Sequence, residues 1–336
     1  MFSEGSSEVF FFVTVANQVT QVYICIQQRV LMNYEVVTLP ELDVEIENLK
    51  KKFGKLTALS GINLKVEKGE VFGYIGPNGA GKTTTIRVLL GILQATEGKA
   101  KVFGLDAWRD AVEIHKRIAY VPGDVNLWPN LTGGEVIDLF VNLRGKQNKV
   151  LREKLLEKFD LDPSKKCRTY SKGNRQKVAL VAALASDAEL YILDEPTSGL
   201  DPLMEQVFQE CILELKNNGK GIFLSSHIMS EVEKLCDRIA IIREGVIVET
   251  GTLSQLRHLT RVSMTIQTDR PIENLTAQKG VHNITENHNG LSFQIDSDEV
   301  GGIISYISQF GVKKLESAPP TLEDLFMRHY SNIGGV

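Results

Sequence analysis

Hydrophobic and polar positions follow a regular order between residues 44 and 259. Short apolar runs bounded by glycine, lysine or polar residues predict strands at 44–49, 64–66, 71–75, 118–121, 190–193 and 222–224. Apolar residues at helical spacing predict helices at 82–90, 106–116, 134–143, 149–159 and 172–185, and one that begins near Asp201 and Pro202. Strands that alternate with helices are typical of a sheet with parallel members covered by helices. The pattern predicts an α/β core, with the helix-rich residues 134–185 as a separate helical lobe.

A different pattern begins near residue 260 and predicts a second, smaller domain. Alternating or helical spacing predicts, in order, a strand at 262–266, a short helix at 271–278, strands at 282–286 and 292–295, a helix at 298–309 and a strand at 312–315. Asn289 and Gly290 tolerate positive φ, so they predict a hairpin turn between the two central strands. The order βαββαβ is that of a ferredoxin-like α+β domain. We therefore expect domains at 44–257 and 260–336, the second closing with a helix at 321–330.

The segment 1–43 is predicted to be a β-prone extension of unknown role. Residues 9–28 carry no charge and are long enough to cross a bilayer, but asparagines and glutamines interrupt the apolar stretch. A secretory signal is not indicated, since Glu4 and Glu8 stand where a basic start is expected. A functional start at Met32 is an alternative explanation of the extension. The sequence predicts no membrane-spanning segment, so a membrane function would need another polypeptide.

Length, net charge and cysteine content exclude some classes of protein. With 336 residues, 43% of them hydrophobic and 24% charged, the chain can bury the cores of about two domains. Its net charge of −4 argues against a protein built mainly to bind nucleic acid, whereas residues 44–259 alone carry +3, which suits an anionic ligand. The four cysteines form no CxxC pair and have no histidine at metal spacing, which is typical of a reduced, intracellular protein.

A glycine-rich loop follows the strand predicted at 71–75. Residues 76–83 read GPNGAGKT and match the phosphate-loop pattern G-x-x-x-x-G-K-[ST], with the expected strand before and helix after them. Successive backbone N–H groups would wrap phosphates at the positive end of the helix. Lys82 would reach the β- and γ-phosphates, and the Thr83 hydroxyl would bind Mg²⁺. The predicted ATP-binding residues here are Gly76, Pro77, Asn78, Gly79, Ala80, Gly81, Lys82, Thr83 and Thr84.

Two carboxylates follow the strand predicted at 190–193. Buried strand residues can place Asp194 beside the shell of the same Mg²⁺ ion, as P-loop NTPases require. Glu195 lies one step further along the chain, where it can polarise an attacking water. Two acidic residues at a strand end are by themselves more often a solvated turn, and the phosphate loop upstream is what favours the catalytic interpretation.

Several segments resemble one family, the ATP-binding subunits of ABC transporters. Residues 170–177 (YSKGNRQK) resemble its signature segment, 196–201 (PTSGLD) its D-loop, and 225–227 (SSH) its switch-histidine segment. Phe53 stands where the family places an aromatic ring on adenine. The resemblance covers residues 44–251, so it implies the P-loop NTPase fold of an ABC ATPase for the core.

The resemblance implies a mechanism in which two such domains face each other head to tail and bury two ATP molecules. The phosphate loop of one subunit would meet the signature of the other, whose trans contacts would be Ser171, Lys172, Gly173 and Asn174. The family's dimer loop corresponds to Ser198, Gly199, Leu200 and Asp201. Glu195 would be the general base, and His227 would hold the γ-phosphate and the water. Taken alone, His227 would be an ordinary capping or core histidine, and Phe53 a core residue.

The chain departs from the family pattern at two places, and one segment is unusually basic. Only Ser171 and Gly173 remain of a signature that usually reads LSGGQ. Gly123 stands where the family usually places a glutamine, and Asp124 beside it is a candidate substitute as a Mg²⁺ ligand. Residues 144–177 carry a net charge of +8, which is usually one solvated face of helices. The functional alternative is a surface that meets an acidic partner or the anionic leaflet.

The tail resembles the small C-terminal domain of some drug- and antibiotic-exporter ATPases, through residues 320–326 (PTLEDLF). Together the resemblances imply a peripheral ATPase subunit at the cytoplasmic face of the membrane, which energises export of a hydrophobic solute. The implied partners are a second ATPase subunit and integral membrane permeases, with no nucleic acid. Two alternatives stay open: a soluble ABC-type ATPase that acts on a protein or nucleoprotein assembly, and a low-turnover ATP switch.

Overall fold

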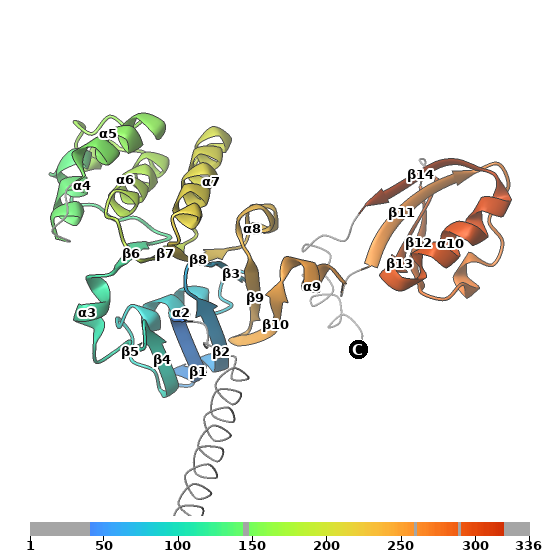
Figure 1. Ribbon diagram of the computed structural model, residues 1–336, viewed down its shortest axis with the longest axis horizontal. Coiled ribbons are helices and arrows are strands. Elements are labelled where there is room, and N and C mark those ends of the chain that lie inside the picture. Colours follow the sequence, from blue (N-terminus) through green and yellow to red (C-terminus); the bar gives the residue numbers. More distant parts are fainter. Residues whose placement is uncertain (1–40, 144–147, 259–260, 288–289, 319–336) are drawn as a thin grey trace, which may run out of the picture. The chain divides into compact units, whose positions relative to one another are not determined.

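The structure is a computed structural model that describes residues 41–143, 148–258, 261–287 and 290–318 (Figure 1). The extension predicted at 1–43 and the helix predicted at 321–330 lie almost wholly or wholly outside the described residues. None of the helices in the described part of the chain is long and apolar enough to cross a membrane.

The core is a six-stranded sheet of order β10-β9-β3-β8-β7-β6. Its strands are β3 (Val71–Ile75), β6 (Ile118–Val121), β7 (Leu190–Asp194), β8 (Gly221–Ser226), β9 (Arg238–Arg243) and β10 (Val246–Thr252). All neighbours pair in parallel except β10, which returns antiparallel along β9. Every residue of β3, β7 and β8 is buried, because helices or a second sheet cover both faces. The predicted parallel sheet is confirmed, and β9 and β10 were not predicted.

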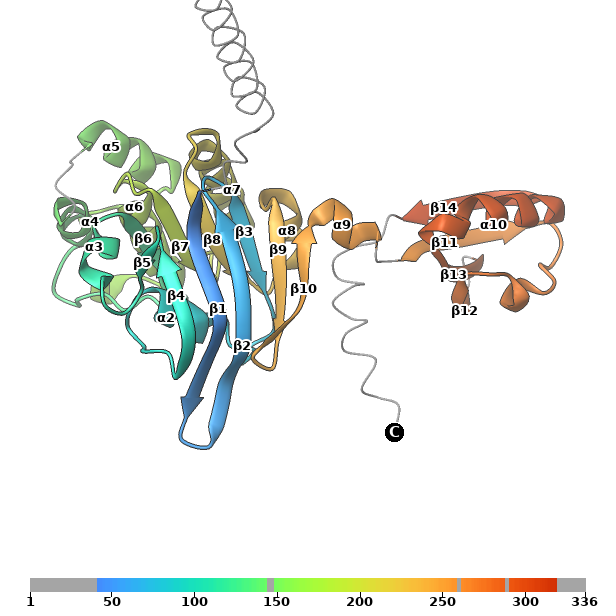
Figure 2. The ribbon, with the colours of Figure 1, turned by 60° about the horizontal axis from the view of Figure 1, so that its bottom comes forward.

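A four-stranded antiparallel sheet of order β2-β1-β4-β5 forms a second layer (Figure 2). Its strands are β1 (Leu42–Phe53), β2 (Leu56–Glu67), β4 (Glu97–Val102) and β5 (Leu105–Asp106). The predicted strands at 44–49 and 64–66 are each only the apolar part of a longer strand. The helix predicted at 106–116 is wrong in its first part, and only α3 (Ala111–His115) is helical. The Asp106 carboxylate accepts hydrogen bonds from the backbone N–H groups of Trp108 and Arg109, which forms a turn there instead.

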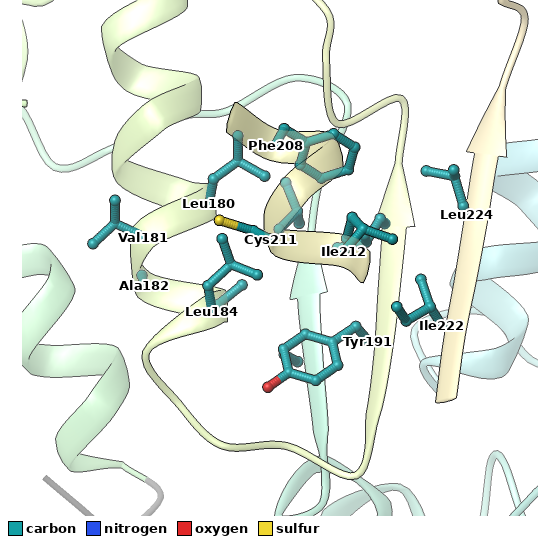
Figure 3. Close-up of a cluster of buried hydrophobic side chains, with 14 of the residues drawn as sticks. Leu180, Val181, Ala182, Leu184, Tyr191, Phe208, Cys211, Ile212, Ile222 and Leu224 are labelled. Carbon is teal, nitrogen blue, oxygen red and sulfur yellow. The ribbon is translucent and has the colours of Figure 1, made fainter. Parts of the chain in front are cut away.

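Helices cover the six-stranded sheet and build the helical lobe. They are α2 (Lys82–Leu89), α4 (Gly133–Asn142), α5 (Lys149–Lys158), α6 (Lys172–Leu184), α7 (Pro202–Asn217), α8 (Met229–Leu235) and α9 (Leu253–His258). The residues Leu180 and Leu184 of α6 and Phe208 and Ile212 of α7 lie near Tyr191 of β7 in one buried cluster (Figure 3). Asp201 begins α7 by accepting a hydrogen bond from the Met204 N–H, which confirms the predicted start of this helix.

The C-terminal part contains a four-stranded antiparallel sheet of order β12-β13-β11-β14. Its elements are β11 (Arg261–Thr268), β12 (Val281–Asn287), β13 (Gly290–Asp296), α10 (Val300–Ile307) and β14 (Val312–Ala318). This order confirms the ferredoxin-like prediction for the sheet. The helix predicted at 271–278 is wrong: only the 3₁₀ turn η2 (Leu275–Ala277) forms, after Asn274 in the left-handed region at φ 50°. The strands beside the predicted hairpin turn pair at Asn287 and Gly290, and residue 289 lies outside the described residues.

Candidate nucleotide site

The phosphate loop runs from the end of β3 to the start of α2. Gly81 adopts φ 113°, a left-handed conformation that favours glycine, and a Cβ at Gly76 would lie 2.4 Å from the carbonyl oxygen of Ile242. The first turn of α2 contains only lysine and threonine, so its N–H groups face no carboxylate of their own helix. The loop therefore has the shape and the polarity of a phosphate cradle.

Lys82 reaches back across the phosphate loop from α2. Its Nζ donates to the carbonyl oxygens of Gly76 at 2.6 Å and Pro77 at 3.2 Å, and it lies 3.2 Å from Glu195 Oε1. The side chain is buried, so its charge acts in an environment of low dielectric constant. Phosphate oxygens brought to this loop would compete with the Glu195 carboxylate for the ammonium group.

The Asp194 carboxylate at the end of β7 is held from two sides. The Thr83 hydroxyl donates to Oδ2 at 2.9 Å, and the Ser225 hydroxyl donates to Oδ1 at 2.5 Å. A buried carboxylate next to a hydroxyl is the oxygen set that Mg²⁺ prefers, so Thr83 and Asp194 fit the predicted metal role. Ser225 was not among the predicted site residues, and its place at the end of β8, next to β7, is the signal that would have indicated it.

Glu195 lies between Lys82 and His227. Glu195 adopts φ 48°, a conformation that is rare outside glycine and that clusters at functional sites. Its backbone N–H donates to the Ser225 carbonyl at 3.1 Å, which fixes the turn. Its Oε2 lies 3.5 Å from His227 Nδ1, while its Oε1 faces Lys82. A carboxylate in this position can accept a proton from a water that attacks a phosphate in the loop.

A cavity of about 480 Å³ joins this polar cluster to an apolar end. Besides the phosphate loop and Glu195, it is lined by Phe53, Leu56, Thr57, Ala58, Glu244 and Gly245. Phe53 is half exposed and lies on the β1–β2 hairpin, as a ring that stacks on a base must. The turn at Gly245 is tied to the loop through the hydrogen bond from its N–H to the Ala80 carbonyl at 2.9 Å. No pattern along the chain indicated Thr57, Ala58 or Glu244 as lining residues.

The predicted signature and dimer loop contact each other, away from the residues that line the cavity. Ser171 begins α6 and its hydroxyl accepts a hydrogen bond from the Asn174 N–H at 3.2 Å. Lys172 Nζ donates to the Ser198 hydroxyl at 3.1 Å. A Cβ at Gly173 would lie 2.5 Å from the Gly199 carbonyl oxygen, so the two segments pack closely there. Leu200 donates its N–H to the Thr197 carbonyl at 3.0 Å and precedes Asp201, the N-cap of α7.

Position 123 faces the Asp194 carboxylate. A Cβ placed on Gly123 would lie 3.1 Å from the Asp194 carbonyl oxygen and 3.8 Å from its carboxyl carbon. A longer side chain at this position would therefore reach the Asp194 carboxylate at the end of β7. Asp124 is exposed, and its carboxylate accepts a hydrogen bond from the Asn126 amide at 3.5 Å.

An apolar groove of about 120 Å³ begins a few residues further on, between this loop, α4 and α6. Its lining includes Tyr120, Pro122, Val125, Leu127, Trp128 and Phe140. Trp128 is 52% exposed and Phe140 42% exposed, with ring centroids 6.2 Å apart. Burial raises the pKa of Tyr120 to about 12, and the charge of Asp194 contributes to this rise. The segment 122–128 thus connects the neighbourhood of Asp194 with the groove.

Within the described part of 144–177, Arg152, Lys154, Lys158 and Lys165 form ion pairs with nearby carboxylates. Arg152 Nε lies 2.6 Å from Asp138 Oδ1, and Lys158 Nζ lies 2.6 Å from Glu214 Oε1. Lys165 lies 3.6 Å from Asp162. These contacts favour the solvated-face interpretation of this charge run over a surface that attracts a distant anion.

The family described as ABC transporter matches residues 59–198, and the family described as ATP-binding protein DrrA1-3-like, C-terminal domain, matches residues 251–330. The uncharacterized ABC transporter ATP-binding protein YhaQ of Bacillus subtilis (strain 168) is 33% identical over 302 residues, which cover 87% of this chain and 98% of that protein. The bacitracin transport ATP-binding protein BcrA of Enterococcus faecalis is 36% identical over 224 residues, 66% of this chain and 73% of that protein. The solved structure of a dimeric bacterial ABC transporter cassette aligns with a TM-score of 0.58 at 24% identity, covering 62% of this chain and 98% of that chain.

Proposed function

Because the chain belongs to the family of ABC transporter ATP-binding subunits, an ATPase family, we propose that it hydrolyses ATP to energise export of a hydrophobic solute through separate membrane permeases. In this proposal the chain is a peripheral protein at the cytoplasmic face of the membrane. The observation that carries the proposal is the meeting of Lys82 and Glu195 in one cavity at the end of the parallel sheet, with His227 Nδ1 3.5 Å from Glu195 Oε2.

Each residue of the site has a separate role in ATP hydrolysis. The N–H groups of the phosphate loop and Lys82 bind the β- and γ-phosphates. At the other end of the cavity, the Phe53 ring stacks on the adenine of ATP. Thr83 and Asp194 would hold Mg²⁺, which supplies positive charge next to the phosphates. Glu195 takes the proton of the attacking water, and His227 orients that water and the γ-phosphate.

The placement of the signature supports a head-to-tail homodimer. Ser171 and the N–H groups at the start of α6 form an anion site that is separate from the residues lining this chain's own cavity. In a dimer, the signature residues Ser171 to Asn174 would close the cavity of the other subunit, and the loop Ser198 to Asp201 would lie between the two sites. The dimeric ABC transporter cassette described above has the same fold, so this fold is compatible with a dimer.

The apolar groove supports a membrane partner. Exposed aromatic rings in a groove bounded by helices fit an amphipathic helix of a permease. The segment 122–128 has Gly123 beside Asp194 at one end and Trp128 in the groove at the other. Movement of a docked helix would therefore reach the site of hydrolysis through this short segment. The relative named for bacitracin transport supports a transport function, and the match to the C-terminal domain of DrrA1-3-like ATP-binding proteins agrees with it.

The two tryptophans of the chain provide a matched test of this partner. Trp108 is 47% exposed and lies outside the groove, whereas Trp128 lies in it. A photo-crosslinking amino acid at each position, expressed in cells, should join position 128 to an integral membrane protein and leave position 108 without that product. Crosslinks from position 128 to soluble or ribosomal proteins would instead support a soluble ABC-type ATPase.

A low-turnover ATP switch is the second candidate, and Gly123 is the observation that favours it. Glycine has no side chain that could contact Asp194, which it faces. One contact that could transmit movement from the apolar groove to the site of hydrolysis is therefore missing. Steady-state ATP hydrolysis with and without the membrane partner separates the two functions. An exporter subunit turns over faster with its permease, whereas a switch binds ATP with little turnover in both cases.

A further inference from the structure

A buried carboxyl group lies directly behind the two proposed catalytic side chains. Glu231 belongs to α8, and only 4% of it is exposed. Its Oε2 accepts a hydrogen bond from the Ser226 hydroxyl at 2.8 Å. Its Oε1 has no hydrogen-bond partner among the residues that the structure describes. A buried, half-satisfied carboxyl is costly for a fold, so its presence needs an explanation.

On one side, Glu231 is connected to the segment that carries His227. The Ser226 hydroxyl donates to Glu231 and accepts a hydrogen bond from the Ile228 N–H at 3.0 Å. Glu231 and this hydroxyl together hold the backbone on both sides of His227. The Ser226 carbonyl also accepts a hydrogen bond from the Gly76 N–H at 3.4 Å, which connects the same residue to the phosphate loop.

On the other side, Glu231 neighbours the segment that follows Glu195. Thr197 is buried, and its hydroxyl lies near enough to the Glu231 carboxyl to lower the pKa of that group. Thr197 belongs to a tight turn in which the Ser198 N–H donates to the Glu195 carbonyl at 3.1 Å. The Gln176 amide of α6 fixes the same turn by donating to the Pro196 carbonyl at 2.8 Å. One carboxyl group therefore lies between the turn that carries Glu195 and the segment that carries His227.

The charge around Glu231 favours its neutral form. Burial raises the pKa of this carboxyl, the Ser226 and Thr197 hydroxyls lower it in part, and the charges of Glu205 and Glu195 raise it further. A neutral carboxyl presents one acceptor, which Ser226 uses, and one O–H donor, which the Thr197 hydroxyl can accept. A glutamine side chain offers the same acceptor and a donor in nearly the same shape.

We propose that Glu231 is a positioning residue for ATP hydrolysis, which joins the His227 segment to the Glu195 turn and so maintains the 3.5 Å approach of these two side chains. This inference rests on the proposed catalytic roles of Glu195 and His227. Glu231 does not touch the nucleotide cavity, whose lining comes from other residues. Its effect is on how the base and the histidine are held, and it should change turnover without changing nucleotide binding.

Glu231→Gln and Glu231→Met form the matched pair that tests this inference. Both are neutral and similar in size, but only glutamine keeps the donor and the acceptor. We expect Glu231→Gln to keep kcat within about twofold, and Glu231→Met to lower kcat by about tenfold to a hundredfold with KM nearly unchanged, as a small misplacement of catalytic groups does. Thermal unfolding should show Glu231→Met to be less stable than the wild type but folded at the assay temperature, because the buried Ser226 hydroxyl loses its acceptor at a cost of about 1–3 kcal/mol.

The inference is overturned if Glu231→Met keeps the wild-type kcat, or if Glu231→Gln loses as much activity as Glu231→Met. Wild-type protein that fails to hydrolyse ATP would contradict the proposed function instead, and the inference is then decided by NMR of the His227 ring. Glu195→Gln identifies the signals that depend on the Glu195–His227 contact. Glu231→Met should shift the same signals and Glu231→Gln should leave them in place, whereas unshifted signals in Glu231→Met would refute the positioning role.

Discussion

Two parts of the chain each bring a histidine next to a carboxylate, and the two pairs have very different surroundings. In the core, His227 Nδ1 lies 3.5 Å from Glu195, beside the buried Lys82 and a cavity of about 480 Å³. In the C-terminal sheet, His282 Nε2 lies 3.1 Å from Asp296, whose other oxygen lies 2.9 Å from Arg261. The second pair is closer, yet it lies at a sheet surface beside an arginine. A histidine–carboxylate contact is therefore not evidence of catalysis unless a ligand site surrounds it.

The type of sheet explains the difference. β3, β7 and β8 run parallel, so Ile75, Asp194 and Ser226 end at the same edge, and the loops after them converge there. In the C-terminal sheet every pairing is antiparallel, so neighbouring strands end at opposite edges. Its polar groups instead form cross-strand contacts, such as the one between the Thr265 and Ser292 hydroxyls at 3.0 Å. The parallel sheet therefore brings reactive side chains together at one edge, whereas the antiparallel sheet distributes its polar side chains over one face.

The largest effect expected from this comparison is the loss of turnover in Glu195→Gln. Removing the carboxylate removes the proton acceptor but leaves the phosphate loop intact, so kcat should fall by about 10²–10⁴-fold while ATP still binds. The variant should accumulate as an ATP-bound dimer, because closure no longer leads to hydrolysis. Mg²⁺-ATP hydrolysis, with dimerisation recorded in the same samples, measures both effects.

Asp296→Asn is the matched control for that experiment, since it breaks the other histidine–carboxylate pair in the same chemical way. We expect its kcat to equal that of the wild type. A comparable loss of turnover in both variants would show that the C-terminal pair takes part in the reaction, and the distinction between the two regions would fail.

The parts of the site that lie in one continuous segment could be predicted from the sequence. The phosphate loop is a glycine-rich turn with a strand directly before it and a helix directly after it. The geometry of residues 76–84 can therefore be predicted from this local order alone. Asp194 and Glu195 follow a wholly apolar strand, which places them at a strand end without knowledge of its neighbours. Local order along the chain is sufficient for these residues.

Contributions that depend on neighbouring strands could not be predicted in this way. Ser225 reaches Asp194 only because β8 lies next to β7, and Glu244 reaches the cavity from a turn between two strands that the pattern did not reveal. Glu231 reads as one of several charged residues on a short helix, and nothing in its neighbours along the chain indicates burial. Asn274 is an example of an element that was predicted but does not form. Its left-handed backbone conformation limits the helix predicted at 271–278 to one 3₁₀ turn.

A second, smaller effect contrasts buried and exposed carboxylates of the two regions. Burial raises the pKa of Asp43 in β1 to about 6, although the Gly69 N–H and Lys68 oppose the rise. The folded state holds this proton more tightly than the unfolded state, so the free energy of unfolding falls as pH rises from about 4 to about 6. Asp43→Asn removes that fall. Urea unfolding should show it gaining at most about 3 kcal/mol over the wild type at pH 7.5, and much less at pH 4.

Asp296 should behave in the opposite direction. The hydrogen bond from His282, and then Arg261, lower the pKa of this exposed carboxyl, so its contribution to stability is present at neutral pH and is lost as pH falls through the folded-state pKa. Asp296→Asn should therefore be less stable than the wild type at pH 7.5 and should approach it in acid. If both aspartate variants shift in the same direction at pH 7.5, the contrast between buried core and exposed sheet does not explain their titration.

The smallest expected effect concerns Gly123, the position where the resemblance predicts a glutamine. Gly123→Gln would place an amide oxygen toward the Asp194 carboxylate, which a Cβ at this position already approaches. One added polar contact is worth about 1 kcal/mol, so the concentration of Mg²⁺ or Mn²⁺ at half-saturation with ATP should fall roughly fivefold. Gly123→Ala adds the Cβ without the oxygen and should leave metal affinity unchanged. Electron paramagnetic resonance of bound Mn²⁺ reports this affinity independently of turnover. Equal metal affinity in the glutamine variant and the wild type would mean that position 123 does not serve the metal, and that the segment 122–128 acts on hydrolysis only through its backbone.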